Sequence, residues 1–179
     1  MPAAFFYDLN SPYAYLAAER IDDLLDAEWV PVLVGAIFKA TGRTSWGLGP
    51  GRADGIAEIE RRAADRGLPP LRWPEPWPGN SLMAMRAAVF AGTPFAREAF
   101  RVHFVDGRTL DDPESVALAA ERSRLDPDVV LQATRDRAIK DTLRANTDRA
   151  LALGVFGVPT VVVDGDVVWG DDRLEEAVR

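Results

Sequence analysis

Hydrophobic and polar positions divide the chain into a few short apolar runs separated by long amphipathic stretches. Short runs rich in β-branched and aromatic residues predict strands, because such side chains pack well on a pleated surface. The predicted strands are 3–8, 29–34, 160–164 and 167–169. Apolar residues at helical spacing, with proline opening several stretches, predict helices at 56–66, 81–91, 94–105, 113–123 and 127–153. Nearly everything between the second and third strands is therefore helix or loop.

The first predicted strand leads into a helix. Residues 8–10 interrupt the apolar run, and Ser11 and Pro12 follow. Serine is a preferred N-cap because its hydroxyl accepts a hydrogen bond from a free amide of the first turn, and proline needs no donor at the next position. The Ser11 hydroxyl is thus expected at a positive helix end, where an anion is stabilised. A cap without a chemical role is the more frequent function of such a Ser-Pro pair.

A second motif precedes the third predicted strand. Gly157, Val158 and Pro159 lead into a β-branched run from Thr160, and a turn at 164–166 returns the chain as a hairpin. Only about 5–6% of X-Pro bonds in folded proteins are cis. The local sequence alone therefore favours a trans bond before Pro159.

Four stretches of sequence carry a resemblance that covers nearly the whole chain. They are 8–15 (DLNSPYAY), 35–42 (GAIFKATG), 80–88 (NSLMAMRAA) and 155–174 (VFGVPTVVVDGDVVWGDDRL). Together they resemble the DsbA-like branch of the thioredoxin superfamily, within it the 2-hydroxychromene-2-carboxylate isomerases and kappa-class glutathione transferases. The resemblance implies an α/β thioredoxin-like fold with a helical insertion. Residues 1–50 and 154–179 would form a discontinuous thioredoxin-like domain, and 51–153 the insertion.

The resemblance also implies a glutathione site. In that family a serine replaces the first cysteine of the CxxC motif, and its hydroxyl supports the thiolate of bound glutathione. The residue before a cis-proline pairs its main chain with the cysteinyl part, and two polar residues of the late motif hold the γ-glutamyl end. The implied catalytic residue is Ser11. The implied cofactor-binding residues are Ser11, Tyr13, Val158, Pro159, Asp171 and Asp172.

Several positions depart from the family pattern. Arg43 stands where the family has an asparagine near the thiol or substrate. Gly51, Asp54 and Glu58 replace the family's lysine, tyrosine and aspartate, and Arg52 could substitute for the lysine that holds a carboxylate.

The late motif departs from the family as well. Asp171 replaces the usual asparagine or serine and adds a negative charge to the expected glutathione site. This charge predicts weaker glutathione binding, or another low-molecular-weight thiol in its place.

Three tryptophans lie in segments that are not expected to be regular. Trp46 belongs to the glycine-rich stretch 44–53, which lacks the lysine of a phosphate-binding loop and is expected to be a flexible loop at the site entrance. Trp73 and Trp77 belong to 68–80, where five prolines predict a stiff extended linker. These tryptophans are expected either to fill the core, the more common fate, or to form an aromatic wall for a ring-bearing substrate.

Composition narrows the chemistry. The chain has no cysteine, which excludes disulfides, thiolate metal sites and dithiol chemistry of its own, so any thiol must arrive on a cofactor. The lone His103 lies in an amphipathic pattern that predicts packing or a surface position rather than catalysis, and no zinc site is expected. A net charge of −7 argues against nucleic-acid or anionic-membrane partners. Without a transmembrane-length stretch or a signal peptide, the expected location is the cytoplasm.

The function implied by the resemblance is glutathione-dependent cis–trans isomerisation of an aromatic enone or pyruvate-type substrate. A small aromatic molecule is then the expected partner, with a homodimer as the common family state. Two alternatives stay open. The first is a kappa-class-like glutathione transferase, which consumes the thiol. The second is a cysteine-less DsbA-like protein that binds thiols or peptides without turnover.

Overall fold

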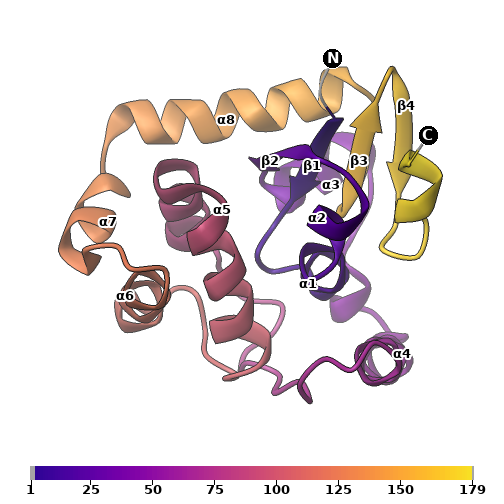
Figure 1. Ribbon diagram of the computed structural model, residues 1–179, viewed down its shortest axis with the longest axis horizontal. Helices are drawn as coiled ribbons and strands as arrows, with labels where there is room; N and C mark the ends of the chain where they lie inside the picture. The colour runs from indigo at the N-terminus through magenta and orange to yellow at the C-terminus, as the bar shows by residue number, and fades with distance from the viewer. Residues whose placement is uncertain (1–2, 179) are drawn as a thin grey trace.

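The computed structural model describes residues 3–178, and within this range four strands form one mixed sheet (Figure 1). The strands are β1 (Ala3–Tyr7), β2 (Ala27–Pro31), β3 (Thr160–Val163) and β4 (Asp166–Trp169). Their order is β2-β1-β3-β4, with β1 parallel to β2, antiparallel to β3, and β3 antiparallel to β4. β1 is buried at every position because it lies inside the sheet and has helices on both faces.

The strand register brings distant parts of the sequence to one edge. Phe6 pairs with Thr160 across the β1–β3 ladder, and Tyr7 pairs with Pro31 across β1–β2. The residues that follow β1 and those that precede β3 therefore lie at the same edge of the sheet. This edge holds both sequence motifs, Ser11 after β1 and Val158–Pro159 before β3.

All the described α-helices lie between β1 and β3 in sequence, and the first two of them lie between β1 and β2. They are α1 (Pro12–Ala18), α2 (Ile21–Leu24), α3 (Val34–Thr41), α4 (Arg52–Asp65), α5 (Leu82–Phe104), α6 (Pro113–Arg122), α7 (Pro127–Ala133) and α8 (Arg137–Ala152). Two 3₁₀ turns, η1 (Trp46–Leu48) and η2 (Leu174–Ala177), complete the described chain. In Figure 1 the helices α5 to α7 gather beside the sheet, and α8 runs along the top from α7 back to β3.

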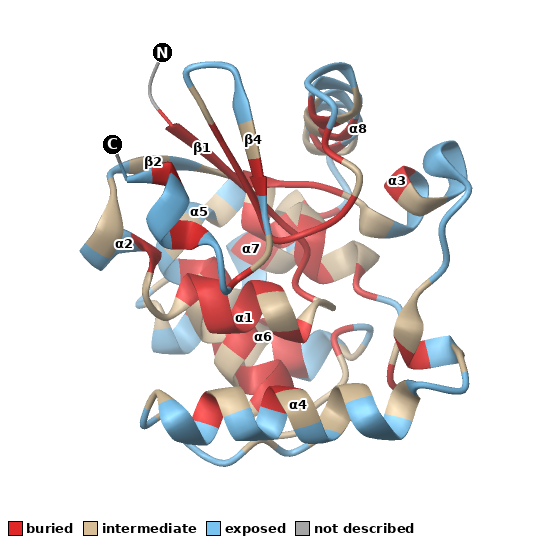
Figure 2. Cartoon of the chain, turned by 90° about the vertical axis from the view of Figure 1, so that its right-hand side faces the viewer, coloured by how far each residue is buried: buried red, intermediate tan, exposed pale blue. Residues whose placement is uncertain are grey.

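Two hydrophobic clusters hold these layers together. On one face of β1, Phe5 and Tyr7 pack with α1 and with Phe100 of α5. On the other face, Phe6 packs with Ile37 of α3 and with the C-terminal end of α8. Figure 2 shows β1 buried throughout, whereas α4 is largely exposed on its outer side. The helix α8 thus contacts both the inserted helices and the sheet.

Three sequence predictions of element bounds need correction. The stretch 127–153 is two helices, because the Asp136 side chain accepts a hydrogen bond from the Ala138 N–H and begins α8 anew. The strand predicted at 29–34 is β2 at Ala27–Pro31, and Val34 begins α3 instead. Part of the expected loop 44–53 is ordered as η1, because the indole of Trp77 packs against Gly47.

The helices predicted at 81–91 and 94–105 are the two parts of α5. Gly92 separates them with φ 75° and ψ −162°, a conformation that only glycine adopts readily. The prediction of two helical segments is therefore confirmed, although they run on as one element.

His103 is buried in the core, which decides between the packed and the surface position that the amphipathic pattern left open. It is 2% exposed, its ring centroid lies 4.5 Å from that of Phe104, and its Nδ1 lies 2.8 Å from the Arg108 carbonyl. Because a carbonyl oxygen only accepts, Nδ1 carries the proton of the neutral ring. Burial lowers the pKa of His103 to about 4.

This buried histidine predicts acid sensitivity. Between pH 6.5 and 4 the unfolded chain binds a proton at His103 that the folded chain does not. The free energy of unfolding should therefore decrease as the pH is lowered from 6.5 to 4. The expected loss is about 3 kcal/mol. Urea denaturation at pH 7 and pH 4 should show a larger loss for the wild type than for His103→Gln, which has no titrating group there. Equal losses in the two proteins would contradict the prediction.

Candidate functional site

Ser11 is the N-cap of α1, as its sequence context predicts. Its Oγ accepts a hydrogen bond from the Ala14 N–H at 3.2 Å, and Pro12 occupies the first helical position. The side chain is half-buried. Within residues 3–178 the hydroxyl donates its own proton to no protein acceptor, so that proton is free for a ligand.

The peptide bond between Val158 and Pro159 is cis, as the resemblance implies and contrary to the expectation from the local sequence. The Pro159 carbonyl accepts a hydrogen bond from the Gly170 N–H at 3.0 Å, which ties this loop to the end of β4. In the described chain, the N–H and C=O of Val158 form no hydrogen bond with another main-chain group. A main-chain donor and acceptor therefore lack a main-chain partner at the same sheet edge as Ser11, although the Val158 residue as a whole is buried.

Asp8 fixes the loop that carries Ser11. Its Oδ1 accepts hydrogen bonds from the Asn10 N–H at 2.9 Å and the Ser81 hydroxyl at 3.2 Å, and its Oδ2 accepts one from the Val34 N–H at 2.9 Å. Burial raises the pKa of this carboxyl, while the three hydrogen bonds oppose the shift. One side chain thus joins the Ser11 loop to the starts of α3 and α5. No motif in the sequence assigns Asp8 this role, and the one available signal is the unusual placement of an acidic residue at the end of a buried apolar run.

Tyr13 links α1 to α4. The Cζ atom of Arg62 lies 5.5 Å from the centre of the Tyr13 ring. The centre of the Trp46 ring lies 5.9 Å from the centre of the same Tyr13 ring. Burial raises the pKa of the Tyr13 hydroxyl, and the nearby Arg62 partly offsets this shift. The predicted binding residue therefore lies between an aromatic neighbour and a guanidinium.

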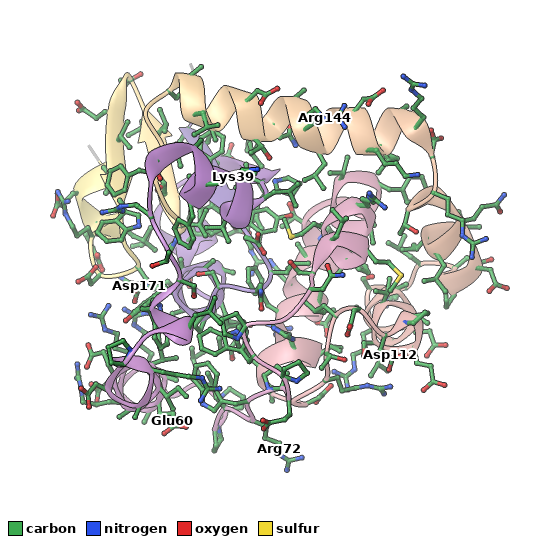
Figure 3. All side chains as sticks on the ribbon, turned by 180° about the vertical axis from the view of Figure 1, so that it is seen from behind. Lys39, Glu60, Arg72, Asp112, Arg144 and Asp171 are labelled. Atoms are coloured by element: carbon green, nitrogen blue, oxygen red, sulfur yellow. The ribbon has the colours of Figure 1, made fainter. Side chains whose placement is uncertain are left out.

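Asp171 and Asp172 lie beside the cis-proline loop but differ in access. Asp171 is 1% exposed, and Arg62 and Arg66 each approach one of its oxygens at 2.7 Å. Asp172 is 57% exposed and lies 3.6 Å from Arg62. In Figure 3 Asp171 lies between α4 and the sheet. The extra negative charge that the sequence places at Asp171 is thus neutralised by Arg62 and Arg66, at the C-terminal end of α4. The i,i+4 spacing of these two arginines was the only signal of the pairing in the sequence.

The predicted tryptophans are mainly core residues. Trp77 is 5% exposed and donates its indole N–H to the Asn10 carbonyl at 3.1 Å. Its ring centre lies 5.1 Å from that of Trp46 and 4.8 Å from that of Trp73. Trp77 therefore fills the core beneath the Ser11 loop, while Trp46 and Trp73 are only partly buried around it.

The two predicted arginines occupy different surroundings. Arg43 is exposed and stacks over Phe156 at 4.6 Å and Trp169 at 5.6 Å, both next to the Val158–Pro159 loop. Arg52 donates to the Trp77 carbonyl at 3.1 Å and faces the indole ring at 5.7 Å. Arg43 thus places a cation and aromatic surface beside the loop, and Arg52 supports the tryptophan cluster.

Two surface hollows lie next to this region, and Arg66 lines one of them. Hollows of about 300 and 450 Å³ line the C-terminal half of α1, with Glu19 in both, and contain none of the predicted site residues. Among residues 3–178, no group of three or more histidine, aspartate and glutamate side chains is placed to hold a metal ion. Over the same range, none of the helices combines the length and apolar character needed to cross a bilayer.

This chain is similar to known proteins over nearly its whole length. The sequence profile of the DSBA-like thioredoxin domain matches residues 4–179. A 2-hydroxychromene-2-carboxylate isomerase from Sphingobium xenophagum is 29% identical over 188 residues, which covers 96% of this chain and 93% of that protein.

Two solved structures extend the comparison. That of a 2-hydroxychromene-2-carboxylate isomerase superposes with a TM-score of 0.84 at 24% identity, over 97% of this chain and 91% of its own. A probable DsbA oxidoreductase from Streptomyces coelicolor superposes with a TM-score of 0.77 at 21% identity, over 99% and 88%. At these identities the two structures bear on the fold alone.

Proposed function

This chain belongs to the DsbA-like thioredoxin domain family, and we propose that it is a thiol-dependent isomerase of the 2-hydroxychromene-2-carboxylate isomerase type. Its substrate would be an aromatic enone or pyruvate-type acid that undergoes cis–trans isomerisation. The observation that carries the proposal is that the free hydroxyl proton of Ser11 and the unpaired main chain of Val158 lie at the same edge of the sheet. The curated relative that aligns over 96% of the chain bears the name of this isomerase.

Glutathione is the thiol that the family resemblance suggests, and the site fits one part of it. The N–H and C=O of Val158 would pair with a peptide-like cysteinyl unit, and the sulfur would then lie at the sheet edge that holds Ser11. A bound thiol would supply the nucleophilic sulfur that adds reversibly to a conjugated double bond and allows it to rotate. The surroundings of Asp171 do not fit the γ-glutamyl end, because arginines already occupy its carboxylate.

Ser11 would stabilise the anionic sulfur. An ordinary thiol has a pKa near 8.5, so it is mostly protonated at neutral pH. A hydroxyl that donates a hydrogen bond to the anion lowers this value, and Ser11 has such a proton available. The chain itself has no cysteine, so it cannot carry out the dithiol exchange of DsbA oxidoreductases.

The substrate end of the site would lie beside Arg43. Its guanidinium, with the rings of Phe156 and Trp169, offers a cation and apolar surface next to the Val158–Pro159 loop. A substrate with an aromatic ring and a carboxylate matches this combination. Arg43 would therefore orient the substrate while the Ser11 edge holds the thiol.

A turnover assay tests the proposal. 2-Hydroxychromene-2-carboxylate is incubated with the protein and substoichiometric amounts of several low-molecular-weight thiols, and product isomer and free thiol are both measured. We expect many isomerised molecules per thiol, with the free thiol recovered. Isomerisation that proceeds at the same rate without thiol would refute the mechanism. Consumption of the thiol into a stable adduct would instead support a transferase.

A further inference from the structure

The guanidinium of Arg62 lies at the centre of three carboxylates. Its Nε is 2.6 Å from Glu58 Oε1, and its Nη1 is 2.7 Å from Asp171 Oδ1. Its Nη2 faces Asp172 at 3.6 Å. Three converging carboxylates are the surroundings that a ligand's ammonium group would need. In this chain a side chain of α4 already fills them.

Arg62 is held firmly in this position. The Tyr13 ring packs on one side of the guanidinium, and Glu58 lies one helical turn away on the same face of α4. Arg66, one turn further on, approaches the second oxygen of Asp171. Moving Arg62 aside would leave the buried Asp171 with one arginine partner instead of two, which opposes its displacement by a ligand.

The local charges leave little attraction for another cation. Arg62 and Arg66 face the carboxylates of Asp171, Asp172 and Glu58, and Glu58 also pairs with Arg61. Hydrogen bonds from Arg62 and Arg61 lower the pKa of Glu58, so it is ionised and paired at neutral pH. Asp172 is the member of this acidic group that is mainly exposed, and an ammonium bound there would lie close to the Arg62 charge.

We propose that Arg62 replaces the ammonium group of a glutathione-like ligand, so that this site selects thiols that lack a cationic amino group at their distal end. The inference rests on the proposed thiol site, and it concerns which thiol that site accepts. A distal end with neutral or anionic oxygen acceptors suits the two arginines, because guanidinium groups only donate hydrogen bonds.

The first experiment compares two ligands that differ by one group. Glutathione and glutaryl-cysteinylglycine, which is glutathione without its amino group, are titrated into the wild-type protein by calorimetry under reducing conditions. We expect the des-amino ligand to bind at least about tenfold more tightly, since like charges repel at short range. Glutathione binding as tightly as the des-amino ligand, or more tightly, would overturn the inference.

The second experiment removes the internal cation. In Arg62→Gln the carboxylates of Asp171 and Asp172 lose their contact with Arg62, while Glu58 keeps its contact with Arg61, so glutathione should gain affinity and the preference for the des-amino ligand should disappear. The matched control is Arg61→Gln, which loses the same charge and a contact with Glu58 but touches neither Asp171 nor Asp172. An equal change of preference in both variants would reduce the effect to net charge and refute a specific role of Arg62.

A double variant keeps the test possible if Arg62→Gln does not fold. If Arg62→Gln unfolds, Arg62→Gln/Asp171→Asn removes the buried carboxylate that has lost a partner and keeps Asp172, and the same change of preference is expected.

Ser11→Ala distinguishes a failure of the proposed thiol site from a failure of the proposed role of Arg62. If both ligands bind equally and Ser11→Ala weakens both, the thiol site stands and the role of Arg62 falls. If neither ligand binds any variant, both proposals fail.

Discussion

Replacing Ser11 by alanine is expected to lower kcat by about 100-fold or more while reducing the free energy of unfolding by only about 1 kcal/mol. Loss of one positioned hydrogen-bond donor to a catalytic anion typically costs 10²–10³ in rate, and the Ser11 hydroxyl proton has no protein acceptor in the described chain. Loss of an N-cap side chain typically costs about 1 kcal/mol. Steady-state kinetics at saturating thiol and urea denaturation measure the two effects.

Asp126→Ala is the control for this prediction. Asp126 caps α7 through hydrogen bonds to the Asp128 and Val129 N–H groups, far along the chain from the site. It should lose a similar amount of stability and keep its turnover. Full turnover in Ser11→Ala would leave Ser11 as a helix cap without a chemical role.

Replacing Trp77 by alanine is expected to lower the free energy of unfolding by about 3–5 kcal/mol, the usual range for a buried tryptophan. The side chain is almost fully buried, packs against Trp46 and Trp73, and bonds to the Asn10 carbonyl. Such a loss is a large part of the 5–15 kcal/mol that stabilises a typical domain. Urea denaturation followed by far-UV circular dichroism measures it.

Trp169→Ala is the matched comparison for Trp77→Ala. Trp169 is 41% exposed and lies at the end of β4, so the same truncation there should cost clearly less stability. If the two variants lost equal stability, Trp77 would not be the core residue that its burial and contacts indicate.

The fold was largely accessible from the sequence because its signals are local or belong to the family pattern. The short runs of β-branched and aromatic residues placed all four strands to within a few residues, and the DsbA-like thioredoxin fold inferred from the motifs is confirmed by the family match and by the superposed isomerase structure. Element ends were harder to predict. A single aspartate cap at Asp136 divides a stretch whose apolar spacing is continuous.

The site was only partly accessible for a different reason. Ser11 and Pro159 stand in recognisable motifs, and the sheet register brings them to one edge. The contact of Arg62 with Asp171 joins positions 109 residues apart, so no local pattern reports it. The same holds for the bond of Asp8 to Ser81. Glutathione binding, the roles of the site residues and a homodimer stay predictions.

The strand order also constrains how the chain can fold as it is synthesised. β1 and β2 are close in sequence and can pair early, but the other edge of β1 pairs with β3, which begins at Thr160. Until β3 emerges, the aromatic strand β1 has an unpaired edge, which is a template for wrong association. Contacts between such distant segments also slow folding. The nascent protein therefore depends on the β3 segment to cover the second edge of β1.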